Sequence, residues 1–229
     1  MTILKKKLFM VISLITLLAS QAAMSAVTTT TVNKQTNTME LSLQYPQGFA
    51  DPAINAIISD FVALNRQELN TVIQADKGPA SLPGKNSLNI SYQIMFENSK
   101  VISLLMTVIT NQRGAAHPVS HVKTFNFISG QQVTLNQILL ENTLKTIADL
   151  SKAALSKKGI TESDWVAKGT SPSEDNYKNW YFTPQGIAIV FDTYQVAAYV
   201  YGAQTVLIPL NMVQSWIRPE IAQAVWGSS

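Results

Sequence analysis

The sequence predicts an α+β fold, a single layered domain in which two long helices pack on a mainly antiparallel sheet. Three observations lead to this prediction. Apolar and polar residues alternate over several short segments, two longer segments repeat apolar residues at helical spacing, and short polar connections join neighbouring strand segments. The elements follow in the order β-α-β-β-β-α-β-β-α, which is typical of antiparallel strands that carry helices on one side.

The first elements are a polar segment, a strand and a helix. Residues 27–37 are polar and rich in Thr, which indicates either a flexible leader or a weak edge strand. The alternation over residues 39–45 predicts a half-buried strand. Asp51 then offers an N-cap and Pro52 a first helical residue, and the helical spacing of apolar residues continues to about Ala75.

Three strands follow a loop that contains two Pro and two Gly. Residues 88–96 alternate clearly, and residues 101–109 are more continuously apolar. The short polar connection between them predicts a hairpin. Residues 119–128 form the next predicted strand.

The second half begins with a predicted second long helix. Thr134 or Asn136 can cap it, and it is expected to run to about Lys158, where a Gly follows as a C-cap. Residues 160–178 form a long polar connector. The remaining predicted elements are a pair of strands, at residues 187–191 and 204–208, and a short helix at 211–216; residues 179–183 lead into the turn before the first of these strands.

The N-terminal segment has the three parts of a secretory signal peptide. Three lysines (5–7) precede an apolar run (8–19), and small residues at 23–25 offer a cleavage site. The apolar run is shorter than the roughly 20 residues needed to cross a bilayer. We therefore expect export to the periplasm or outside the cell, with no membrane span after cleavage. The predicted division is a signal peptide (1–26), a flexible leader (27–37), one domain (38–218) and a C-terminal tail (219–229).

Charge and cysteine content exclude several classes of function. The signal holds three of the 17 basic residues and none of the 14 acidic ones, so the mature chain has 17 − 3 = 14 basic residues against 14 acidic ones. Because these charges balance, the mature chain has no net positive charge of the kind that attracts nucleic acid. The chain has no Cys, which excludes disulfides, thiolate nucleophiles and thiolate metal sites.

The two histidines, His117 and His121, are candidates for chemistry. Pro118 and the strand pattern that follows place them on a loop entering a strand, where a spacing of four separates the two rings. We therefore expect no metal site and no cofactor. A Ser/His/Asp site could be assembled from Ser120, His121 and Asp192, but the Gly-x-Ser-x-Gly elbow typical of such hydrolases is missing from the sequence.

Aromatic residues gather near the end of the chain. Tyr194, Tyr199 and Tyr201, together with Trp180 and Tyr181, could form a platform for a sugar or a protein. The same residues could instead pack in the core with their hydroxyl groups at its rim. The sequence favours neither reading.

Two parts of the chain resemble a known family. One is the loop at residues 114–117 followed by the Lys-Thr-Phe-Asn-Phe strand at 123–127, and the other is the closing segment 180–202. They are similar to the RsiV-like domain of unknown function, which is found in exported bacterial proteins and includes the lysozyme-binding part of the anti-sigma factor RsiV; secreted antigens of the MPT type are also similar. Gln195 and Ala198 depart from this pattern, which usually has Glu and Pro there. The matched structural positions are Gly114, Ala116, Pro118, Gly186, Gly202 and Pro209.

The resemblance implies an exported domain without catalytic activity. We expect a cell-envelope binding module whose ligand is a lysozyme-like muramidase, peptidoglycan or another envelope protein. The expected ligand-binding residues are His117, Tyr194, Gln195, Tyr199 and Tyr201. The alternative is a hydrolase of envelope polymer that uses His117 with a carboxylate such as Asp192, which requires the two side chains to lie within hydrogen-bonding distance.

Overall fold

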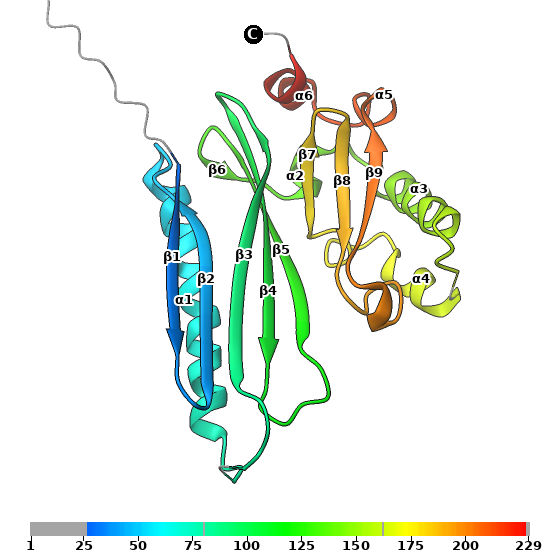
Figure 1. The fold of residues 1–229 in the computed structure, drawn as a ribbon. Coiled ribbons are helices and arrows are strands. Elements are labelled where there is room, and N and C mark those ends of the chain that lie inside the picture. Colours follow the sequence, from blue (N-terminus) through cyan, green and yellow to red (C-terminus); the bar gives the residue numbers. More distant parts are fainter. Residues whose placement is uncertain (1–26, 80, 162, 228–229) are drawn as a thin grey trace, which may run out of the picture.

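The computed structural model describes residues 27–227 except for residues 80 and 162, and it confirms the α+β class (Figure 1). The predicted signal peptide lies outside the described residues. The strands form two sheets, where the sequence analysis expected one. The first sheet has the order β1-β2-β3-β4-β5-β6. Its strands are β1 (Thr28–Gln35), β2 (Met39–Gln47), β3 (Asn86–Glu97), β4 (Val101–Asn111), β5 (Val119–Ile128) and β6 (Gln131–Gln132).

The helix α1 (Pro52–Ala75) joins β2 to β3 and makes them the one parallel pair of this sheet. Its predicted start is confirmed, because the Asp51 side chain accepts a hydrogen bond from the N–H of Ala53 and Pro52 is the first helical residue. Buried residues of α1 pack with those of the strands in one core. The helix therefore covers one face of the first sheet (Figure 1).

Residues 27–37 were interpreted from the sequence as either a flexible leader or a weak edge strand, and the structure shows the strand β1 there. It pairs antiparallel with β2 along its whole length, from Thr28 opposite Gln47 to Gln35 opposite Glu40. The segment is therefore the edge strand and not a free leader. Its mostly exposed, polar side chains are usual for a strand at the edge of a sheet.

The second sheet is antiparallel, in the order β7 (Trp180–Thr183), β8 (Gly186–Phe191) and β9 (Gln204–Pro209). Every residue of β8 is buried. Its Ile187, Ile189 and Phe191 enter a second core with the C-terminal helices, whereas Ala188 and Val190 lie toward the first sheet. The central strand is thus covered on both faces, which explains its continuous apolar pattern.

The predicted helix from Thr134 to Lys158 is wrong as a single element. It is divided into α2 (Leu135–Ile138) and α3 (Leu144–Lys157). Between them the N–H of Leu140 donates to the carbonyl of Trp216 at 2.7 Å, and Asn142 has a positive φ of 62°. Thr134 does cap α2, in a capping box with Gln137.

The predicted tail and connector also contain helices. The tail holds α6 (Pro219–Trp226), whose Ala222 and Val225 are buried in the second core. The connector holds α4 (Ser163–Gly169), and α5 (Leu210–Val213) follows β9. The domain therefore extends beyond residue 218.

A row of buried polar groups joins the two sheets. Along β5, Phe125 and Phe127 lie in the core with α1, so the alternate residues Thr124 and Asn126 point to the other face, toward β7. Asn126 Nδ2 donates to the carbonyl of Trp180 at 2.7 Å. The N–H of Trp180 in turn donates to Thr124 Oγ1 at 2.9 Å.

The neighbouring strand β4 extends this row. Ser103 Oγ donates to Asn126 Oδ1 at 2.6 Å and accepts from the N–H of Phe182 at 3.1 Å. The free edge of β7 is therefore satisfied by side chains of the first sheet instead of by another strand. We call Ser103, Thr124 and Asn126 the polar seam.

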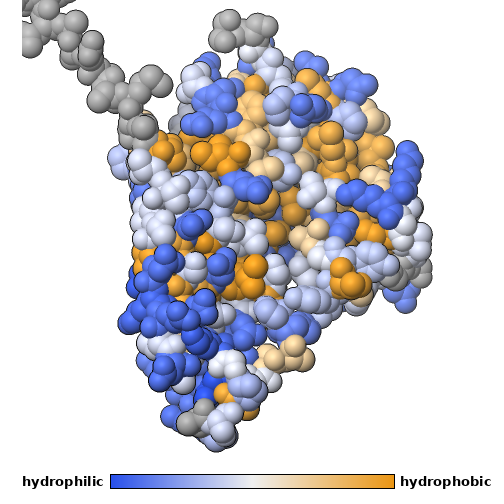
Figure 2. All heavy atoms as spheres, viewed as in Figure 1, coloured by the Kyte–Doolittle hydropathy of each residue, from blue (hydrophilic) through white to orange (hydrophobic). Residues whose placement is uncertain are grey.

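The surface drawn in Figure 2 has a hydrophobic part and a hydrophilic part. Hydrophobic side chains gather over its upper and middle parts, where the two sheets meet, and the lower end is mostly hydrophilic. Within the described part of the chain, no helix is both long and apolar enough to cross a membrane.

Candidate functional site

Four aromatic rings contact one another in series at one end of the second sheet. His117 stacks on Tyr199 with ring centroids 4.2 Å apart and planes 27° apart. Tyr199 lies 5.6 Å from Tyr194, and Tyr194 lies 6.3 Å from Trp165 in an edge-to-face arrangement. We call His117, Tyr199, Tyr194 and Trp165 the aromatic row.

The rings of the aromatic row come from three segments, and two of the rings lie in the connection between β8 and β9. His117 lies on the loop between β4 and β5, Trp165 on α4, Tyr194 in the turn after β8, and Tyr199 at the start of the 3-10 helix η1 (Tyr199–Tyr201). The fold therefore brings His117 and Trp165 to a pair of tyrosines that are themselves close in the sequence. Of the residues expected to bind ligand, His117, Tyr194 and Tyr199 come together.

The row is accessible to a ligand. Tyr194 is 46% exposed and Trp165 is 37% exposed, whereas a purely structural cluster would be buried. On η1, beside the row, Tyr201 is also 46% exposed and Val200 is 85% exposed. Exposed aromatic and apolar groups gathered at one place are typical of a binding surface.

The backbone of Tyr194 is strained. Its φ is +68°, a left-handed conformation that bulky side chains seldom adopt. The turn that holds it is closed by the N–H of Gln195, which donates to the carbonyl of Asp192 at 2.9 Å. Strain of this kind concentrates at functional sites, because the surrounding structure must be built to maintain it.

Gln195 points inward and holds this turn in place. Its Oε1 accepts from the N–H of Asp192 at 2.9 Å. Its Nε2 donates to the carbonyls of Gly169 at 3.1 Å and Asn176 at 2.9 Å, which belong to the connector. The structure thus gives Gln195 a positioning role beneath the row, because it ties the turn of Tyr194 to the end of the helix that carries Trp165.

Ala198 is the second departure from the family pattern, and its backbone conformation would still suit the proline that is usual at this position. Ala198 has φ −61° and ψ 158°, within the range that proline imposes. The Ala at this position therefore preserves the path of the chain into η1.

The hydrolase arrangement expected from His117 and Asp192 is not formed. His117 Nδ1 lies 2.8 Å from the carbonyl of Pro118, and its ring faces Tyr199. Asp192 instead contacts His121 Nδ1 at 3.1 Å and accepts from the N–H of Val122. The carboxylate ties β5 to the end of β8, so Asp192 pairs with His121, as in the Ser120, His121 and Asp192 arrangement considered from the sequence, and the expected pair with His117 is not formed.

Trp180 and Tyr181 are core residues. They are 1% and 7% exposed, so they do not contribute to the surface. The ring of Trp180 packs edge-to-face on Phe182, which in turn contacts Trp226. For these two residues, the core reading of the sequence analysis is correct.

Trp165 is the residue of the row that the sequence analysis missed as a site. A large aromatic residue in an otherwise polar connector was the available signal. Nothing in the sequence placed it beside Tyr194, because 28 residues and two strands separate the two positions.

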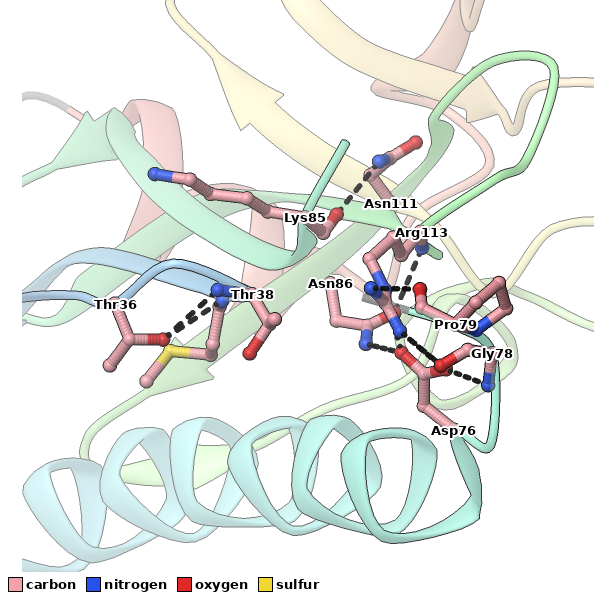
Figure 3. A network of polar contacts seen from close by, with 10 residues as sticks. Thr36, Thr38, Asp76, Gly78, Pro79, Lys85, Asn86, Asn111 and Arg113 are labelled. Carbon is pink, nitrogen blue, oxygen red and sulfur yellow. Dashed lines mark hydrogen bonds and ion pairs between the residues drawn. The ribbon is translucent and has the colours of Figure 1, made fainter. Parts of the chain in front are cut away.

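A polar network fixes the base of the loop that carries His117 (Figure 3). Arg113 donates to both carboxylate oxygens of Asp76, at 2.9 and 3.0 Å, and its N–H donates to Asn86 Oδ1 at 2.8 Å. These bonds connect the end of α1 to β3 and to the end of β4. Gly114 follows with a φ of +82°, and the loop begins there.

The same network lowers the pKa of Asp76 well below its ordinary value. The hydrogen bonds from Arg113 are the largest cause, followed by those from the N–H of Gly78 and from Asn86, whereas burial acts in the opposite direction. Asp76 in turn raises the pKa of Arg113. The pair remains ionised across the ordinary pH range and acts as a fixed clamp.

The other positions matched to the family lie in turns. Gly186 begins β8 with a φ of +139°, and a Cβ there would lie 2.1 Å from a backbone oxygen of β9, so only glycine fits. Gly202 ends η1 with a φ of +62°, and Pro209 ends β9. Ala116 and Pro118 flank His117 in the exposed loop. Across the described residues, no cluster of three or more His, Asp or Glu side chains is arranged to hold a metal ion.

Comparisons with known proteins agree with this fold. Residues 136–211 match the model of the family described as protein of unknown function (DUF3298). Two solved structures of DUF3298 family members are similar. One, from Bacteroides fragilis NCTC 9343, has a TM-score of 0.63, 14% identity, and coverage of 88% of this chain and 98% of that one. The other, from Pseudomonas aeruginosa PAO1, has a TM-score of 0.60, 12% identity, and coverage of 86% and 95%.

The chain is also similar in sequence to a curated protein that is named as an enzyme. The chain is 28% identical over 145 residues to the peptidoglycan-N-acetylmuramic acid deacetylase PdaC of Bacillus subtilis (strain 168). The match covers 59% of this chain but only 30% of the deacetylase. The family match includes Trp165, Tyr194 and Tyr199, and His117 lies outside it.

Proposed function

We propose that this chain, whose residues 136–211 carry the DUF3298 domain, is an exported, non-catalytic module that binds peptidoglycan through the aromatic row. The observation that carries the proposal is the series of partly exposed rings contributed by three separate segments of the chain. The strained backbone of Tyr194 and the inward hydrogen bonds of Gln195 support it, because both hold the rings in fixed positions.

The ligand class is supported by the relative and by the predicted export. PdaC is named for action on a peptidoglycan sugar, and the region it shares with this chain is 30% of its length. A protein delivered across the membrane by a signal peptide would reach peptidoglycan.

The chemistry of the row suits a glycan strand. Sugar rings present apolar faces of C–H groups, which pack on aromatic rings and remove apolar surface from water. Tyr194 and Trp165 would make this contact. Tyr199, held between His117 and Tyr194, would support them from behind.

The test is a sedimentation assay with purified peptidoglycan sacculi and the mature protein. We expect saturable binding that Tyr194→Ala and Trp165→Ala each weaken by about 5- to 30-fold, which corresponds to roughly 1–2 kcal/mol for an aromatic contact at a binding surface. The control is Leu64→Ala on α1, which removes a side chain that is 56% exposed and far from the row in the fold. Unchanged binding in both row variants would refute the role of the row.

A lysozyme-like muramidase is the second candidate ligand. The exposed side chains of Val200 and Tyr201 beside the row favour it, because neighbouring exposed apolar and aromatic side chains are typical of a protein–protein interface. Calorimetry with lysozyme distinguishes the two ligands. Binding to lysozyme with no binding to sacculi would replace peptidoglycan by the muramidase, and the absence of both would reject the proposal.

A further inference from the structure

A histidine and an aspartate lie next to the aromatic row without belonging to it. His121 is near the start of β5, four residues after His117, and Asp192 directly follows β8. Asp192 and Tyr194 occupy one turn, which the N–H of Gln195 closes by donating to the carbonyl of Asp192 at 2.9 Å. The pair is therefore linked to the row twice, through the segment of His117 and through the turn of Tyr194.

The carboxylate of Asp192 is held from several sides. Its Oδ1 accepts from the N–H of Val122 at 3.2 Å and from the N–H of Thr193 at 2.8 Å. Its Oδ2 lies 3.1 Å from His121 Nδ1. The side chain of Asp192 is 21% exposed, whereas that of His121 is 59% exposed. A fixed and mostly covered carboxylate thus orients an imidazole that remains open to solvent.

This contact determines which nitrogen of His121 carries the proton. A carboxylate oxygen accepts hydrogen bonds and does not donate them, so Nδ1 is the donor. In the neutral imidazole, Nε2 is then left as an acceptor. Among the described residues, Nε2 has no hydrogen-bond partner. Beside the aromatic row, the structure therefore presents an uncharged acceptor whose orientation Asp192 fixes.

We infer that His121 Nε2 accepts a hydrogen bond from a glycan bound on the aromatic row, and that Asp192 is the positioning residue for this contact. The inference rests on the proposed function, because the row supplies the surface on which the sugar faces stack. A sugar carries its donors around the perimeter of the ring, between the two apolar faces, so a side chain at the edge of a stacking surface can reach them. The donor is a hydroxyl group or the N–H of an acetamido group, since Nε2 accepts from either.

The test uses two linear tetrasaccharides, tetra-N-acetylchitotetraose and cellotetraose, titrated into the mature protein by calorimetry. They differ in each sugar by an acetamido group in place of a hydroxyl group. His121→Phe keeps a flat ring and removes both nitrogens, and we expect it to weaken binding by about 3- to 10-fold, as for the loss of one hydrogen bond. A loss with both probes identifies a hydroxyl donor, and a loss with the acetylated probe alone identifies the acetamido N–H.

Gln44→Phe is the matched control. It changes an exposed polar residue of β2, which β3 and β4 separate from β5, and it should leave both affinities unchanged. Native affinity for both probes in His121→Phe, with weaker binding in Tyr194→Ala, would overturn this inference and leave the row intact. Weaker binding in His121→Phe, with native affinity in both Tyr194→Ala and Trp165→Ala, would refute the role of the row, on which the inference rests. A native protein that binds neither tetrasaccharide would overturn the inference, and the sacculi assay decides the proposed function separately.

Asp192→Asn tests the positioning role. Its side-chain oxygen can still accept from Val122 and Thr193, but its amide would donate to His121 Nδ1, which places the proton on Nε2. Nitrogen NMR shifts of the imidazole should show this change of tautomer. The affinity should fall as in His121→Phe, with no further loss in the double variant, because both changes remove the same acceptor. A proton that stays on Nδ1, or losses that add in the double variant, would overturn the role of Asp192.

Discussion

Asn126 is the central residue of the polar seam, and its replacement tests whether the seam holds the two sheets together. Asn126 is 2% exposed, and its two hydrogen-bond partners, Ser103 and Trp180, are 0% and 1% exposed. Asn126→Ala would leave the hydroxyl of Ser103 without its acceptor and the carbonyl of Trp180 without its donor. Each buried group that loses its partner costs about 1–3 kcal/mol. We therefore expect the free energy of unfolding to fall by about 2–6 kcal/mol for the two groups together.

The assay is urea denaturation followed by circular dichroism and tryptophan fluorescence. Asn89→Ala is the matched control, because Asn89 is exposed on β3 and a surface change of this kind should alter stability by less than about 0.5 kcal/mol. A loss of less than about 1 kcal/mol in Asn126→Ala would refute the reasoning. It would mean that water or a small shift of β7 satisfies the groups that the amide now serves.

Two further predictions concern the clamp and the turn that position the row. Because the pKa of Asp76 is lowered in the folded state, its contribution to stability should be complete above its unfolded pKa of about 3.9 and be lost as the pH falls through the folded value. Denaturation midpoints across this acid range should therefore show the stability difference between the native protein and Asp76→Asn shrinking as the pH falls, and a difference that does not change with pH would contradict this. Gln195→Glu should destabilise the protein by about 1–3 kcal/mol at neutral pH, because a carboxylate cannot donate to the carbonyls of Gly169 and Asn176. The loss should diminish at low pH, where a protonated acid can donate one of these bonds, and full stability of this variant at neutral pH would be the contrary result.

The elements with strong local signals could be predicted from the sequence. Asp51 and Pro52 specified the start of α1, and the alternation over β2 and β3 specified their buried faces. These features depend on residues that are near one another in the chain. Local spacing is therefore sufficient to predict them.

The division into two sheets could not be predicted in this way. Thr124 and Asn126 alternate with Phe125 and Phe127, and polar residues at such positions usually face solvent. Here they face a second sheet, and only the tertiary contact reveals it. The break after α2 was missed for a similar reason, because the backbone of Leu140 bonds to Trp216, which lies 76 residues further along the chain.

Three of the four residues of the candidate site were predictable from the sequence, but Trp165 and the geometry of the site were not. The Tyr-rich segment and the loop of His117 were identified from the sequence, and the fold brings them into contact. The roles within the site were not predictable. Asp192 meets His121 instead of His117, and Gln195 supports the row from below.

The most direct test of the account is an NMR titration of the mature protein with soluble glycan fragments of peptidoglycan. If the aromatic row binds the glycan, the amide signals that move should cluster at Trp165, Tyr194 and the residues of η1. Signals that move only on β1 or α1, or that do not move at all, would contradict the claim that this surface recognises peptidoglycan.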